Sequence, residues 1–69
     1  MSDSLGTELP KIMTHVRDHL IPLYQSIGPA GAFAIAFMRA DLDAAQRAMI
    51  EGDVVEMIRL YAKLKEYKE

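Results

Sequence analysis

Cysteine and tryptophan are both absent from this chain of 69 residues. Without cysteine there is no disulfide framework, no thiolate ligand for a metal and no thiol nucleophile, which excludes disulfide-stapled secreted domains and cysteine-based zinc modules. A chain this short buries only a limited core, and chains of this size often gain stability by association. The composition therefore favours a cytoplasmic location and contact with another chain.

Excess charge and long apolar runs are also missing. The 8 lysines and arginines nearly balance the 10 aspartates and glutamates, so the net charge of -2 gives no general attraction to nucleic acid or anionic lipid. The longest nearly uncharged stretch, residues 20–38, is interrupted by Pro22 and Pro29. It therefore does not form the continuous apolar helix of about 20 residues that spans a bilayer. The first six residues do not have the pattern of a signal peptide, and we expect no membrane partner.

Hydrophobic residues make up 51% of the chain, and their spacing is helical throughout. We expect a flexible tail over residues 1–6 and a single helical domain over residues 7–69. Thr7 is a plausible N-cap for a first helix over about residues 8–27. Pro22 falls inside this helix, and because the apolar stripe keeps its phase beyond it, the pattern predicts a kink rather than a break.

A second helix is predicted over about residues 30–51, after a turn at Gly28 and Pro29. Its first half is apolar nearly all round, which is typical of a buried helix or of an interface. Asp41 is discordant because it falls on the apolar side of the wheel. Either a single helix continues through Asp41, or Asp41 caps a break there, which would give four helices instead of three.

Gly52 and Asp53 predict a sharp junction between this helix and a last one over about residues 54–67. Glycine suits the left-handed position after a helix end, and Asp53 followed by Glu56 is typical of a capping box. The fold class is therefore all-α, a small bundle of three helices, or of four if the second one breaks, with a C-terminal αα-hairpin.

The last helix has two apolar stripes, and a three-helix bundle needs only one of them. We interpret the second stripe as an interface for a second copy of the chain or for a helix of a partner protein. Phe37 is expected in the core, and so are the internal methionines except Met57. The predicted interface residues are Phe33, Met57, Leu60, Leu64 and Tyr67.

No motif in the chain indicates a catalytic, cofactor or metal site. His15 and His19 have a spacing that can place two imidazoles on one metal, but the expected glutamate base and a third ligand are lacking. Asp41 and Asp43 resemble the start of a calcium loop whose later positions do not fit. We therefore expect a non-enzymatic protein with no cofactor.

The alternative function is a small regulator that binds nucleic acid. The αα-hairpin has part of the spacing of a helix-turn-helix unit, but charged residues stand where its core packing needs apolar ones. Basic residues that could contact phosphates lie on the last helix: Arg59, Lys63, Lys65 and Lys68. The preferred hypothesis is a small cytoplasmic protein–protein interaction or oligomerisation module, with a homodimer as its expected form.

Overall fold

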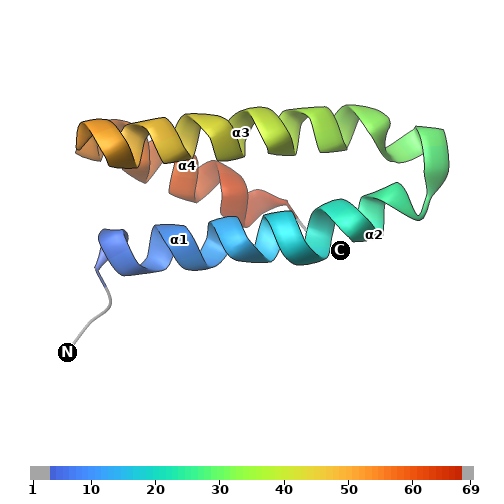
Figure 1. Ribbon diagram of the computed structural model, residues 1–69, viewed down its shortest axis with the longest axis horizontal. Helices are drawn as coiled ribbons and strands as arrows, with labels where there is room; N and C mark the ends of the chain where they lie inside the picture. Colours follow the sequence, from blue (N-terminus) through green and yellow to red (C-terminus); the bar gives the residue numbers. More distant parts are fainter. Residues whose placement is uncertain (1–3, 68–69) are drawn as a thin grey trace.

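The computed structural model describes residues 4–67, and within that range it contains helices and turns but no strand. Its elements are α1 (Leu5–His15), the π-helix η1 (Val16–Leu20), α2 (Ile21–Gln25), the 3-10 helix η2 (Gly28–Gly31), α3 (Ala32–Glu51) and α4 (Val54–Glu66). As Figure 1 shows, α1, η1 and α2 form one continuous rod, α3 returns alongside it, and α4 packs against both. The prediction of a small all-α bundle with a C-terminal αα-hairpin is confirmed.

The first rod begins earlier than predicted. Its N-cap is Ser4, with extended backbone angles of φ -89° and ψ 162°, and the Ser4 carbonyl accepts hydrogen bonds from the amides of Thr7 and Glu8. The predicted N-cap at Thr7 is therefore wrong, and so is the assignment of residues 5 and 6 to a flexible tail. Residues 1–3 of that tail lie outside the described part of the chain.

Pro22 is accommodated by a π-helical turn directly before it. The amide of Ile21 donates to the carbonyl of Val16, five residues earlier, so the turn is wider than in an α-helix. A wider turn gives more room to the proline ring, which in a regular α-helix collides with the carbonyl of residue i-4. The prediction that the helix continues through Pro22 is confirmed.

A close approach of backbones fixes the turn between α2 and α3. Gly28 has φ +75°, the left-handed conformation that glycine adopts most easily. At Gly31 an added Cβ atom would lie 2.3 Å from the carbonyl oxygen of Tyr24, so only glycine fits. From Ala32 the next helix runs unbroken to Glu51, and the alternative of a break near Asp41 is wrong.

The junction at Gly52 and Asp53 is as predicted. Gly52 has φ +71°, and the Asp53 side chain accepts a hydrogen bond of 3.2 Å from the amide of Glu56. The last helix therefore starts at Val54, and it ends at Glu66 with Tyr67 as the residue that follows it.

The core lies between the first rod, α3 and α4 and contains residues from all three: Leu9, Val16, Leu20, Ile21, Met38, Ala45, Ala48, Leu60 and Leu64. Met38 is fully buried, whereas Met13 and Met57 are partly buried and Met49 is 36% exposed at the edge. Phe37 is 64% exposed, so its predicted place in the core is wrong. The inward side of α3 is set by Met38, and Phe37 points away from it.

Candidate interaction surfaces

Leu60 and Leu64, two of the predicted interface residues, are fully buried within the single chain. The interpretation that they form a spare apolar stripe is corrected by this burial, because a side chain covered by its own chain offers a partner nothing to contact. The first rod packs against α4 and covers its second stripe, which the periodicity of α4 alone does not predict. Met57 and Tyr67, two further predicted interface residues, are only partly exposed and pack against the core.

Asp41, the discordant residue of α3, holds the end of α4. One carboxylate oxygen accepts a hydrogen bond of 2.6 Å from the Tyr67 hydroxyl, and the other accepts one of 2.9 Å from Lys63 Nζ. Asp41 is only 7% exposed, and within residues 4–67 no other charged residue is buried. Burial and the bond to Asp41 raise the pKa of Tyr67 above its ordinary value. The helical wheel marks Asp41 as unusual, but its partners on α4 are more than twenty residues away and have no local signal in the sequence.

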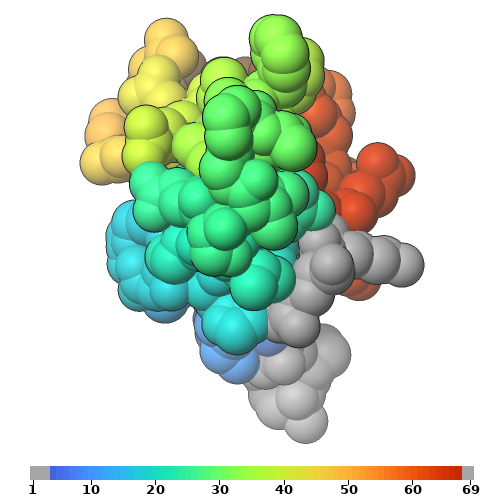
Figure 2. All heavy atoms as spheres, turned by 90° about the vertical axis from the view of Figure 1, so that its right-hand side faces the viewer, coloured from blue at the N-terminus to red at the C-terminus, as the bar shows by residue number. Residues whose placement is uncertain are grey.

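The first half of α3 has no cover from α4, because α4 ends beside Asp41 in the middle of α3. Figure 2 looks onto this end of the molecule: the green atoms of α2, η2 and the start of α3 lie in front, and the red atoms of α4 lie to one side. Phe33 is 79% exposed and Phe37 is 64% exposed. Two aromatic rings one helical turn apart are therefore uncovered on the same element.

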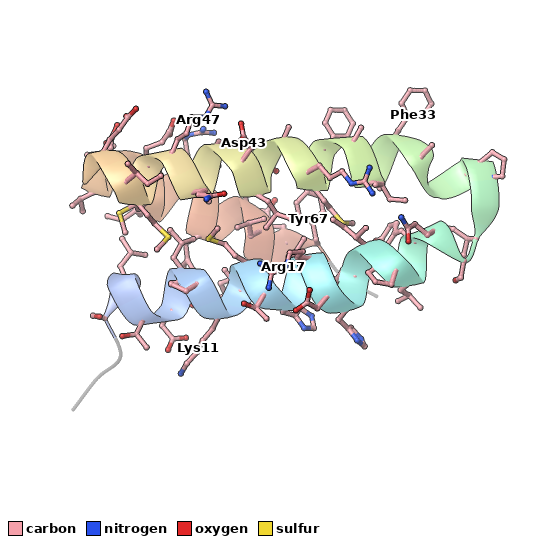
Figure 3. All side chains as sticks on the ribbon, viewed as in Figure 1. Lys11, Arg17, Phe33, Asp43, Arg47 and Tyr67 are labelled. Atoms are coloured by element: carbon pink, nitrogen blue, oxygen red, sulfur yellow. The ribbon has the colours of Figure 1, made fainter. Side chains whose placement is uncertain are left out.

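An ion pair occupies the second half of the same side of α3. Arg47 donates to Asp43 at 2.5 Å, and both side chains are about two-thirds exposed. In Figure 3, Phe33, Asp43 and Arg47 all lie on the side of α3 that faces away from α1. We call this surface the outer face of α3; it consists of Phe33, Ala36, Phe37, Ala40, Asp43, Ala44 and Arg47. All of these residues are exposed except Ala44, which is partly buried.

Further exposed apolar side chains lie at the other end of the molecule, at the α3–α4 junction. Val55 is 79% exposed, Ile50 is 77% exposed, and Val54 and Ile58 are each a little over half exposed. These residues come from the last turn of one helix and the first turns of the next. No aromatic ring is among them.

The basic residues of the predicted nucleic-acid surface have partners within the chain. Arg59 is paired with Glu56, which raises the pKa of the Arg59 guanidinium and lowers that of the Glu56 carboxyl. Lys63 is bound to Asp41, and Lys65 Nζ lies 5.1 Å from the centre of the Tyr61 ring. Lys68 lies outside the described residues. The described cations of this surface are therefore engaged with their own chain.

His15 and His19 stack on each other along the first rod. Their ring centres are 5.1 Å apart with an angle of 25° between the planes. Between them, Arg17 Nε donates to Asp18 at 2.9 Å, which lowers the pKa of that carboxyl. Among residues 4–67, no group of three or more histidine, aspartate or glutamate side chains is placed to hold a metal ion. Within the same range no helix is long and apolar enough to cross a membrane.

Comparisons of the chain with protein-family models, with curated proteins and with solved structures found no match.

Proposed function

We propose that this chain is a small, non-enzymatic protein–protein interaction module that binds its partner through the outer face of α3. The observation that carries the proposal is the exposure of Phe33 and Phe37 on a helix whose opposite side is packed into the core. Aromatic side chains are enriched at the energetically dominant positions of interfaces, because they bury a large area with few rotatable bonds. Two phenylalanine rings that stay exposed to water add little to the stability of the folded monomer.

The surroundings of these rings also suit an interface. Exposed alanines lie beside them, which allows another backbone to come close, and an ion pair lies farther along the same face. An apolar centre next to polar groups is the usual composition of a protein contact surface. The proposal takes the cytoplasm as the compartment, which the cysteine-free composition favours.

The alternative of nucleic-acid binding has less support. Release of counterions requires lysine and arginine side chains that are free to meet phosphates. Arg59, Lys63 and Lys65 would each have to give up a contact within the chain first.

Photo-crosslinking tests the proposed surface. A benzophenone amino acid is placed at Phe33 in the full chain, and a matched probe is placed at Ile58, an exposed apolar residue of α4. We expect the probe at residue 33 to give an adduct with one protein identified by mass spectrometry, and Phe37→Glu to abolish that adduct. Absence of an adduct, or equal adducts from the two probes, would overturn the proposed surface.

A further inference from the structure

We infer that the partner on the outer face of α3 is a second copy of this chain, packed antiparallel across a two-fold axis that passes close to Ala40. The inference rests on the proposed function and identifies the partner for the same surface. In such a pair, two helices face each other with opposite direction, so each contact away from the axis occurs twice.

The sequence of α3 suits antiparallel pairing with a second α3, because this pairing places complementary side chains opposite each other. With the axis at Ala40, Ala36 of one copy lies level with Ala44 of the other, and Phe33 lies level with Arg47. The guanidinium of Arg47 is then placed at the Phe33 ring of the second copy, and the same cation–π contact forms on the other side of the axis. The ion pair with Asp43 already holds Arg47 on this face.

Charge decides between the two possible directions. A parallel pair would set Arg47 beside Arg47 and Asp43 beside Asp43, which places like charges together. The antiparallel pair instead sets the aromatic half of each helix against the ionic half of the other. It also opposes the two helix dipoles, which is the favourable arrangement.

The centre of the face allows two helices to come close together. Ala36, Ala40 and Ala44 recur every fourth residue, so no large side chain keeps the two backbones apart at the centre. A helix of 20 residues is about 30 Å long, and the longest extent of the molecule is 38 Å.

Single cysteines test this geometry without interference, because the chain has none of its own. When a residue lies next to a two-fold axis, its side chains from the two copies are close together. Ala40→Cys should therefore form a covalent dimer in high yield under mild oxidation. Ala36→Cys should crosslink poorly with itself, because its level neighbour is Ala44 and not Ala36, and a disulfide needs Cα atoms within about 7 Å. Lys11→Cys, on the opposite side of the molecule in Figure 3, sets the background of random collisions.

Two arginine variants test the cation–π contact by sedimentation equilibrium. Arg47→Ala removes the contact twice and should raise the dissociation constant of the dimer about tenfold or more. Arg17→Ala is the matched control, since Arg17 is also paired with a neighbouring aspartate and has a similar exposure, 62% against 67%. We expect it to leave the constant unchanged.

A monomeric parent chain at tens of micromolar, Ala40→Cys at the background yield, or stronger self-crosslinking of Ala36→Cys would each overturn the antiparallel dimer. The result of the Phe33 probe distinguishes failure of the dimer from failure of the proposed function. A Phe33 probe that captures a different, identified protein while the parent chain is monomeric would refute the dimer and retain the surface. A probe that captures nothing would refute both.

Discussion

Replacing Asp41 with alanine removes both hydrogen bonds that join the end of α4 to the middle of α3. The bond from the Tyr67 hydroxyl is short, 2.6 Å, and ends on a buried charged acceptor, for which about 1.5–3 kcal/mol is typical. The bond from Lys63 contributes at most about 1 kcal/mol, because that side chain is 47% exposed and water screens the pair. We therefore expect Asp41→Ala to lower the free energy of unfolding by about 2–3 kcal/mol.

This loss is large for so small a domain, whose total stability is on the order of 3–10 kcal/mol. It corresponds to a fall in the melting temperature of about 10–20 °C. Urea unfolding followed by circular dichroism measures it, at one fixed chain concentration because association adds to stability. A double-mutant cycle with Tyr67→Phe should give a coupling energy of about 1 kcal/mol or more.

Asp18→Ala is the control, because Asp18 is also paired with a basic residue but is exposed to solvent. We expect its urea midpoint to match that of the parent chain. A midpoint for Asp41→Ala equal to the parent's would refute the argument that Asp41 anchors α4. A coupling energy near zero would refute the role of Tyr67 in that anchor.

Gly31→Ala should lower the free energy of unfolding by about 2 kcal/mol or more, because its Cβ would meet the Tyr24 carbonyl, and thermal melts that match the parent would contradict this. Gly52→Val should cost about 1–2 kcal/mol in the same assay, because valine avoids φ +71°, and an unchanged midpoint would show that the backbone there is not left-handed. Tyr67 should also make stability depend on alkaline pH. Its pKa is raised in the folded chain, so its contribution is complete below the unfolded pKa of about 10 and is lost as pH rises through the folded value. Urea midpoints at about pH 9 and pH 11 should fall further for the parent than for Tyr67→Phe, and equal falls would contradict the assignment.

The helices were predictable from sequence because their signals are local. The backbone and capping preferences of Gly52 and Asp53 are sufficient to predict the junction. The spacing of three and four between apolar residues continues on both sides of Pro22, which predicts one continuous helix. The start at Ser4 was missed because serine and threonine both suit an N-cap, and only the backbone hydrogen bonds of the folded chain distinguish Ser4 from Thr7.

The exposed surface was harder to predict because it depends on how far each helix extends along its neighbours. Leu60, Leu64 and Phe37 all lie on apolar stripes, and periodicity alone gives no reason to bury the first two and expose the third. The structure decides this through the length of α4, which ends beside Asp41 and leaves the first half of α3 uncovered. Asp41 was the one sequence signal of that end point, and its partners on α4 are more than twenty residues away.

Sedimentation equilibrium on the parent chain and two charge variants tests whether the outer face of α3 binds a second copy. Phe37→Glu places a carboxylate level with Asp43 of the second copy, whereas Ile58→Glu places one at a similarly exposed apolar site on α4. We expect twice the chain mass for the parent and for Ile58→Glu at tens of micromolar, and the single-chain mass for Phe37→Glu with unchanged helicity. A parent chain of single mass, or Ile58→Glu dissociating as readily as Phe37→Glu, would contradict this expectation.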